Sequence, residues 1–374
     1  MKYCKLCLQP DTRPNEIFND EGICSACINY SKNKELDYAS RYQILENIIS
    51  KYKKKSGDFF DCIIGVSGGK DSTRQAVWVR DKLGLKPLLV SLVYPPQQVN
   101  NLGAQNLSNL IELGFDVLIS SPAPVVWQKL VKEAFLRFAN WCRATEMALY
   151  SSVPKIALKN KIQLIFIGEN QSFRDQKTIG SKGWQYNNLI SQNTLNGGNI
   201  EWMLETGIEN KYLLPYQYPT HEEINKGGLE IVDLGWFIGN WDNLTNAKAS
   251  SSIGLNIRSD TVLNTGDPVG VSALDEDWVT LNQMIKYYKF GFGKVTDYVN
   301  EDIRLGRIER DNGIKLINKY DGKCADIYIE TFCNYIKISI EDFWDVVRKN
   351  VNKKLFHIKE NGDISPKFKV GIGL

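Results

Sequence analysis

The 374-residue sequence lacks any long apolar run. No stretch approaches the roughly 20 apolar residues of a membrane-spanning helix, and no N-terminal apolar segment resembles a signal peptide. A strong charge of either sign is also absent, because 46 basic residues oppose 43 acidic ones and leave a net charge of +3. That excess is too small for a nucleic-acid coat. We therefore expect a cytoplasmic protein without a membrane span, for which nucleic acid is not the expected partner.

Cysteine is present, but in a pattern that does not suggest disulfides. Eight cysteines without an export signal point to the reducing cytosol, where thiols bind metals or are structural. Four of them form the pairs Cys4-x2-Cys7 and Cys24-x2-Cys27, which can close a tetrahedral Zn²⁺ shell. A segment of this size cannot fold on an apolar core alone, so we predict a structural zinc ribbon at residues 1–31. An iron–sulfur cluster is the alternative.

The heptapeptide Ser67-Gly68-Gly69-Lys70-Asp71-Ser72-Thr73 is the most informative segment of the chain. It follows the apolar run 61–66 and opens a segment with helical apolar spacing, so a strand, a turn and a helix N-terminus are expected to meet there. Converging backbone amides and the helix dipole favour phosphate, and paired glycines let the backbone approach it. The common phosphate loop is excluded, because Ile64 and Asp71 stand where it needs Gly and Ser or Thr.

From residue 58 onward, strand-like and helix-like segments alternate, which predicts an α/β fold with a doubly wound parallel sheet. Strands are expected at 59–66, 87–93, 116–120, 162–168 and 229–237, and helices near 99–113, 125–138 and 145–159. Residues 171–228 are rich in Asn, Gln and Gly, and are expected to form loops and short helices over the site. Charge-rich helices are expected to fill 275–360.

The Ser-Gly-Gly-x-Asp-Ser pattern resembles the pyrophosphate loop of the ATP pyrophosphatases, which split ATP between its α- and β-phosphates. The resemblance implies that residues 67–73 bind ATP. It also implies a pyrophosphate-loop ATP-binding domain at 58–265. This domain would follow an amphipathic connector helix at 32–57 and precede a C-terminal helical region at 266–374.

In a doubly wound sheet, ligands bind at the carboxyl ends of the strands, where the strand order reverses. We expect Gly168 and Glu169 at this edge, together with Tyr94, which the family's geometry would place beside the adenine. Asp71 and Glu169 are candidates to organise Mg²⁺, because hard oxygen ligands suit that ion. Lys70 is expected to be exposed on the loop and to neutralise the departing pyrophosphate. The alternatives are a carboxylate near a helix N-cap for Glu169 and an ordinary surface lysine for Lys70.

The order of several motifs narrows the resemblance to one family. The cysteine pairs and the loop are followed by Gly168-Glu169-Asn170, Trp241-Asp242, the segment 289–297, Asp302-Ile303-Arg304-Leu305-Gly306-Arg307 and Lys319-Tyr320-Asp321-Gly322. In this order they resemble the N-acetyl sugar amidotransferases of lipopolysaccharide, O-antigen and nonulosonic-acid biosynthesis. The resemblance implies that the acetamido oxygen of an N-acetylated sugar is adenylylated by ATP. Ammonia would then displace AMP to give an acetamidino sugar.

The resemblance also implies a source of ammonia outside this chain. Cys4 follows three residues, so we do not expect an N-terminal-cysteine glutaminase, and only two histidines, His221 and His357, are available for a Cys-His-Glu one. The family interpretation is a separate glutaminase subunit, similar to that of imidazole-glycerol-phosphate synthase, with a cyclase-like subunit as a further partner.

Several alternatives stay open at this point. Lys289 and Lys294 are candidates to contact phosphate or sugar, or else belong to a solvated basic face. Trp241-Asp242 is either a sugar-stacking site or a structural turn. A tRNA sulfur transferase is the main rival function, although its usual central cysteine pair is missing, since Cys142 stands alone. The other two alternative functions are a non-catalytic ATP-binding scaffold and asparagine-synthetase-like chemistry on a small carboxylate.

Overall fold

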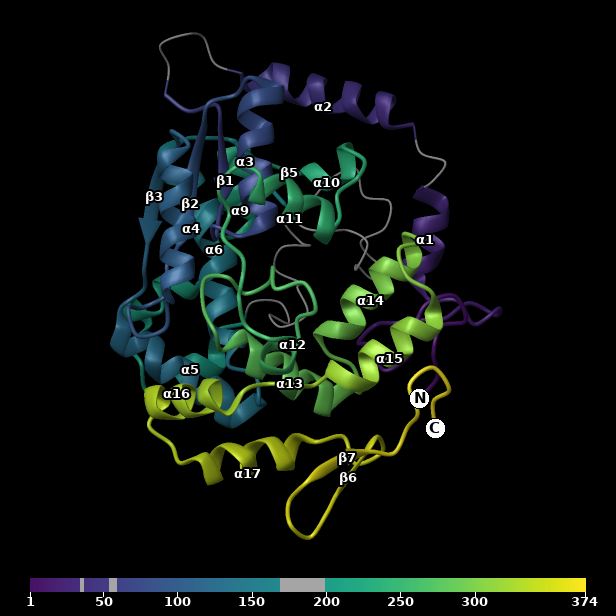
Figure 1. Ribbon diagram of the computed structural model, residues 1–374. Helices are drawn as coiled ribbons and strands as arrows, with labels where there is room; N and C mark the ends of the chain where they lie inside the picture. The colour runs from purple at the N-terminus through teal and green to yellow at the C-terminus, as the bar shows by residue number, and fades with distance from the viewer. Residues whose placement is uncertain (34–36, 54–58, 169–198) are drawn as a thin grey trace.

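The computed structural model describes residues 1–33, 37–53, 59–168 and 199–374 (Figure 1). Within these residues, five parallel strands form one sheet in the order β3-β2-β1-β4-β5. Their bounds are β1 Cys62–Gly65, β2 Pro87–Leu92, β3 Asp116–Ser120, β4 Leu164–Ile167 and β5 Glu230–Asp233. The chain runs from β1 outward to β3 and then returns to β4 on the other side of β1. The predicted doubly wound sheet is therefore confirmed, and its order reverses between β1 and β4.

Alternating side chains of the strands bury both faces of the sheet, as the pleat requires. Cys62 and Ile64 of β1 pack with α2 (Tyr38–Tyr52), α3 (Lys70–Leu83) and α4 (Asn101–Glu112) on one face. Ile63 points to the other face, where it packs with α6 (Cys142–Asn160) and α9 (His221–Gly227). Because both faces are covered at β1, β2 and β4, these strands are continuous apolar runs in the sequence, and this is why they could be predicted, whereas the edge strand β3 is largely exposed.

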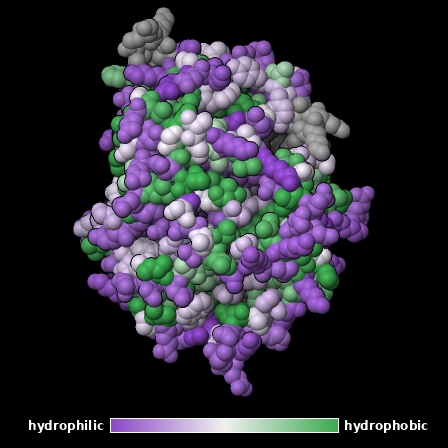
Figure 2. Space-filling view, in the orientation of Figure 1, coloured by the Kyte–Doolittle hydropathy of each residue, from purple (hydrophilic) through white to green (hydrophobic). Residues whose placement is uncertain are grey.

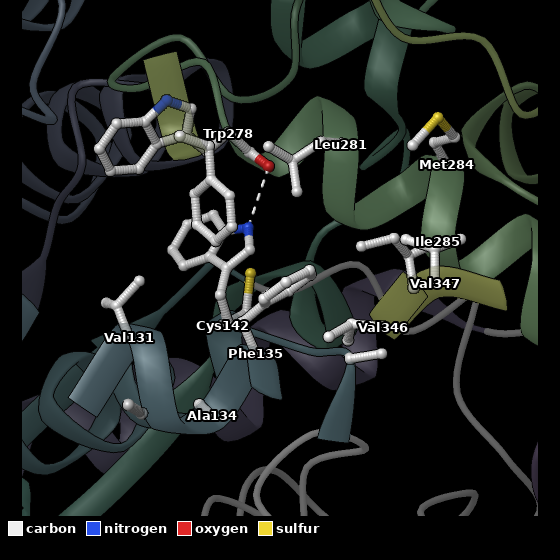
Figure 3. Close-up of a cluster of buried hydrophobic side chains, with 14 of the residues drawn as sticks. Val131, Ala134, Phe135, Cys142, Trp278, Leu281, Met284, Ile285, Val346 and Val347 are labelled. Carbon is white, nitrogen blue, oxygen red and sulfur yellow. Dashed lines mark hydrogen bonds between the residues drawn. The ribbon is translucent and has the colours of Figure 1, made fainter. Parts of the chain in front are cut away.

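A second core joins the helices around α5 to the C-terminal helices (Figure 3). Val131, Ala134 and Phe135 of α5 (Pro124–Phe138) face residues of α13, α16 and α17. The rings of Phe135 and Phe343 stack with their centroids 5.1 Å apart. This cluster crosses the predicted boundary between residues 265 and 266, which stays a prediction. The C-terminal helices are α13 Val279–Phe290, α14 Lys294–Arg304, α15 Arg310–Tyr320, α16 Asp326–Ile336 and α17 Ile340–Asn350.

Two predicted elements differ from the structure. Strand β5 ends at Asp233 rather than at residue 237, because the Asp233 carboxylate accepts a hydrogen bond from Gly235 N (3.1 Å) and caps the short helix α10 (Leu234–Phe237). The predicted C-terminal helices stop at α17. Beyond it, β6 (Phe356–Ile358) pairs antiparallel with β7 (Ile364–Pro366).

The remaining described elements are short or lie outside the sheet. Residues 199–228, the described part of the predicted loop region, hold short helices as expected. These helices and the others not yet named are α1 Ser25–Asn33, α8 Glu201–Leu204, η3 Asn210–Tyr212, η4 Leu214–Tyr216, α11 Asn243–Ser251 and α12 Val262–Thr265. The chain ends meet, because Leu374 N donates to Met1 O at 3.2 Å (Figure 1).

Hydrophilic and hydrophobic side chains are interspersed on the face shown in Figure 2, in keeping with the balanced charge of the chain. In the described ranges, no helix combines the length and the apolar character needed to cross a bilayer.

Candidate active site

The predicted phosphate-binding turn leaves β1 and leads directly into α3. Gly68 has φ +77°, and a Cβ there would lie 3.1 Å from backbone atoms of Asn106 and Leu107 in α4. Only glycine fits a left-handed residue this close to another backbone. Gly69 is the N-cap of α3, and in the described residues no side chain caps that end of the helix. The first-turn amides of α3 are therefore open to an anion, which the helix dipole favours.

Lys70 and Asp71 are neighbours in space as well as in sequence. Lys70 Nζ donates to Asp71 Oδ2 at 2.8 Å, and Asn246 Nδ2 of α11 donates to Asp71 Oδ1 at 2.5 Å. The Lys70 side chain is only 8% exposed, against 34% for Asp71. The expectation of an exposed Lys70 is thus wrong. Helix α11 packs along α3, and its Ser250 hydroxyl donates to the backbone oxygen of Lys70 at 2.6 Å.

The Trp241-Asp242 pair has a structural role. Trp241 is buried, and the Arg74 guanidinium lies 4.9 Å from the centroid of its ring. Asp242 caps α11 by accepting from Thr245 N (3.0 Å), and it pairs with Arg307 at 2.7 Å. Burial opposes ionisation of Asp242, but the bonds from Thr245 and Arg307 outweigh it and lower the pKa of the carboxyl. The structure favours the turn over a sugar-stacking indole.

A cavity of about 770 Å³ lies where the turn meets the carboxyl ends of the strands. Its lining comes from distant parts of the chain: the cysteine-rich ribbon, the turn, the strand ends, α6, and the segment that leads into α13 and α14. Most of the residues predicted for the site line it: Ser67, Gly69, Lys70, Asp71, Ser72, Gly168 and Lys294. The volume is in the range of pockets that bind a nucleotide-sized ligand.

Four predicted residues are placed elsewhere. Gly68 faces α4, and Thr73 is fully buried in α3. Tyr94 packs edge-on against Trp127, with ring centroids 5.7 Å apart, so it does not line the cavity as expected for an adenine contact. Lys289 Nζ donates to Phe138 O at 2.8 Å, away from the cavity, and burial lowers the pKa of this lysine. Glu169 lies outside the described residues.

Sequence reasoning missed Arg13, which brings the ribbon into the cavity wall. Its guanidinium pairs with Asp297 of α14 and lies 4.5 Å from the centroid of the Phe292 ring. Lys286 Nζ also contacts Asp297, at 2.7 Å. Burial opposes ionisation of Asp297, but Arg13, Lys286 and Lys294 together hold the pKa of this carboxyl well below its usual range. Asp297 is the last residue of the motif at 289–297, so that motif was the available sequence signal for this part of the cavity.

The four ribbon cysteines form a closed cluster. Their sulfur atoms all lie within 4.8 Å of one another, with Cys7 Sγ and Cys24 Sγ 3.6 Å apart and Cys4 Sγ and Cys27 Sγ 4.0 Å apart. Tetrahedral Zn–S bonds of about 2.3 Å would separate the sulfurs by about 3.8 Å, so the cluster fits a metal ion. Arg304 Nη1 lies 3.9 Å from Cys7 Sγ, where its charge offsets that of the thiolates. Cys62 and Cys142 are buried in separate hydrophobic clusters, and burial raises the pKa of both thiols.

The comparisons with known proteins bear on the C-terminal part of the cavity. Residues 274–369 match a family model described as LPS biosynthesis protein WbpG-like, C-terminal domain. This segment of the chain is similar to that family. The match covers about a quarter of the sequence and includes Lys294 and Asp297 of the cavity wall. It confirms the predicted link to surface-polysaccharide biosynthesis.

No curated protein matches the chain. Among solved structures, one listed match is the U34-tRNA thiolase NcsA from Methanococcus maripaludis with its [4Fe-4S] cluster, at 9% sequence identity and a TM-score of 0.29. It covers 90% of this chain and 96% of that chain. A score this low supports no inference about the chemistry here.

Proposed function

We propose that the protein is an ATP-dependent amidotransferase of surface-polysaccharide biosynthesis. It would adenylylate the acetamido oxygen of an N-acetylated sugar and let ammonia replace that oxygen, releasing AMP and pyrophosphate. The observation that carries the proposal is the shared cavity: the Ser67–Ser72 turn and the WbpG-like segment line the same space. Chemistry on ATP and recognition of a sugar can therefore occur side by side.

The turn would hold the β- and γ-phosphates of ATP. The amides around Gly69 and the N-terminus of α3 supply donors, and Lys70 supplies a cation that is already beside the turn. Asp71 is the partly exposed carboxylate of this group, and Asn246 fixes its orientation. It would hold Mg²⁺ between the phosphates, because that ion takes oxygen ligands. Glu169 was expected as a second ligand and stays a prediction.

The reaction requires positioning and charge stabilisation more than an enzyme nucleophile. The amide oxygen attacks the α-phosphorus, and the bond to pyrophosphate breaks. The resulting imidate carbon then takes ammonia, and AMP leaves with the former acetyl oxygen. An amide oxygen is a poor leaving group, whereas AMP is a good one. Fixed cations at Lys70 and Lys294 would stabilise the charge that develops on the phosphates.

The cysteine cluster would hold Zn²⁺ in a structural role, because four thiolates leave no open coordination position. Arg13 lies in the ribbon between the two cysteine pairs, so the metal would hold this guanidinium at the cavity.

Ammonia would come from a separate glutaminase subunit, with a cyclase-like subunit as a further partner. His221 begins α9 and His357 lies on β6, and neither is among the residues that line the cavity. Free ammonium salts should replace this partner in an assay.

The proposal is tested by incubating the protein with ATP, Mg²⁺, ammonium and a panel of free and nucleotide-linked N-acetylated sugars. The acetyl oxygen is labelled with a heavy isotope. Mass spectrometry should show amide-to-amidine conversion for one sugar class, with the label in AMP. Label in inorganic phosphate, or thiolation of tRNA supplied instead of sugar, would contradict the proposal.

Asp71→Ala should reduce sugar-dependent pyrophosphate release by about 10²-fold or more, because an electrostatic contact to the reacting phosphates is lost. Asp81→Ala is the matched control: Asp81 is on the same helix but pairs with Arg80 on the surface, so activity should stay near wild type. Retained turnover in Asp71→Ala would reject the site.

A further inference from the structure

Asp275 is a carboxylate of the cavity wall that the proposed function does not yet use. It lies in the segment before α13 and lines the same cavity as the Ser67–Ser72 turn. In the part of the chain that the structure describes, the donor recorded at its carboxylate is its own backbone amide. The carboxylate of this lining residue therefore keeps acceptor capacity for a ligand.

Helix α4 places Asp275 beside the phosphate-binding turn. A Cβ on Gly103 of α4 would lie 2.5 Å from Asp275 Cα, and Asn100 N donates to Asp275 O at 3.2 Å. Gly68 of the turn packs against Asn106 of the same helix. Residues 103 and 106 are three positions apart on α4, which is nearly one helical turn and about 4.5 Å of rise along the helix axis. Helix α4 therefore contacts both Asp275 and the turn, and fixes the spacing between them.

The charged groups around Asp275 leave it without a strong cationic partner. Burial is the main influence and raises the pKa of Asp275 to about 6, while its own backbone amide and the charge of Arg258 act to lower it. The Arg258 guanidinium pairs instead with Asp260 and Asp277, at 2.9 and 2.8 Å.

Two further groups face Asp275. Glu276 accepts hydrogen bonds from the backbone amides of Trp278 and Val279, so its carboxylate is engaged. Burial and the negative charges of Asp275 and Glu276 raise the pKa of Tyr94 well above its usual value, so this phenol stays neutral. Asp275 is left as the group of this set that can exchange a proton with the cavity.

We propose that Asp275 is the general base of the amination step, an inference that rests on the proposed function. The ammonia lone pair forms a bond to the carbon of the protonated imidate, which gives a tetrahedral intermediate carrying an ammonium group. Asp275 takes one proton from that nitrogen. The freed lone pair then expels AMP by breaking the C–O bond, and the product is the amidinium. Asp275 returns its proton to water.

This role predicts a separation of two partial reactions in Asp275→Asn. Exchange of labelled pyrophosphate into ATP, driven by the sugar without ammonia, should stay within a few-fold of wild type, because adenylylation needs no base at this position. Amidine formation should fall by about 10²–10⁴-fold, the usual contribution of a general base. The acidic limb of the wild-type pH–rate profile, expected near pH 6, should disappear, whereas Asp275→Glu should retain it.

Stability separates this role from a structural one. Burial raises the pKa of Asp275 from 3.8 to about 6, so stability falls as the pH rises through this range and the ionised carboxylate still costs stability at pH 8. Asp275→Asn should therefore match or exceed the wild-type Tm at pH 8. Asp277→Asn is the control, with the same charge change two residues away. It breaks the Arg258 pair and should lower Tm while leaving the pH profile unchanged.

Three results would overturn the inference. Equal losses of exchange and amidine formation would make Asp275 a ligand for metal or substrate, and unchanged amidine formation would remove it from the chemistry. A lowered Tm with proportional loss of both reactions would make it structural. A wild-type protein that makes no amidine refutes the proposed function itself, and this outcome is distinct because it precedes any comparison of variants.

Discussion

The ribbon and the sheet reach the same cavity by different physical means. The buried cluster of the ribbon consists almost entirely of its four cysteines, whereas the sheet buries apolar side chains on both faces. A segment as short as the ribbon has too little apolar surface to fold alone, and a metal held by the four cysteines would supply the missing free energy. The sheet positions its turn through sterics, since Gly68 fits where no other residue does.

The two regions also differ in how they are attached to the rest of the molecule. A few contacts attach the ribbon: Leu8 is buried in the C-terminal core and its N donates to Asn300 Oδ1 at 2.7 Å, and Arg13 pairs with Asp297. The sheet shares its packing with α3, α4 and α6 over a large buried area. Damage to the ribbon should therefore remove one wall of the cavity and leave the sheet folded.

The largest effect is expected from Cys24→Ser. Loss of one thiolate should release the bound ion, open residues 1–31 to protease and abolish most sugar-dependent activity, while the sheet still unfolds cooperatively and still binds ATP. Cys324→Ser, in a half-buried thiol far along the chain from the ribbon, is the matched control. Metal analysis and limited proteolysis measure the outcome, and an unchanged metal content would refute the four-thiolate site.

A smaller effect, confined to the sheet side, is expected from Gly68→Ala. A left-handed alanine costs about 1–2 kcal/mol, and its Cβ would press on the α4 backbone, so the KM for ATP should rise about 10-fold or more. In Gly69→Ala the new Cβ meets only the movable Ser67 hydroxyl at 3.2 Å, with φ −78°. Equal KM values for the two variants would show that the turn does not hold the nucleotide.

The smallest effect is expected from substitution of two lysines, Lys294 and Lys289, for which the sequence predicted the same role. Lys294 lines the cavity, so Lys294→Ala should raise the KM for ATP or sugar by about three- to tenfold. Lys289 bonds the Phe138 carbonyl, so Lys289→Ala should lower Tm slightly and leave KM unchanged. Steady-state kinetics and thermal melts check both, and a KM effect at Lys289 would contradict the placement.

Much of the fold could be predicted from local sequence patterns. Strands buried on both faces are unbroken apolar runs, and the cysteine spacing is typical of a metal-binding cluster, so both were recognised correctly. The burial of Lys70 was not predictable, because it depends on α11, about 180 residues away in sequence. The placement of Tyr94 was not predictable for the same reason. Its ring packs against the buried Trp127, which is distant in sequence.

The sequence by itself determined the turn, the cysteine cluster and the order of strands and helices, because each of these depends on residues that are neighbours or regularly spaced. Only the tertiary structure decided that Arg13, Asp71, Asp275 and Lys294 line one cavity. These residues come together because the ribbon, α4 and α14 pack against one another. The free energy of that packing comes from contacts between segments distant in sequence, which local patterns do not reveal.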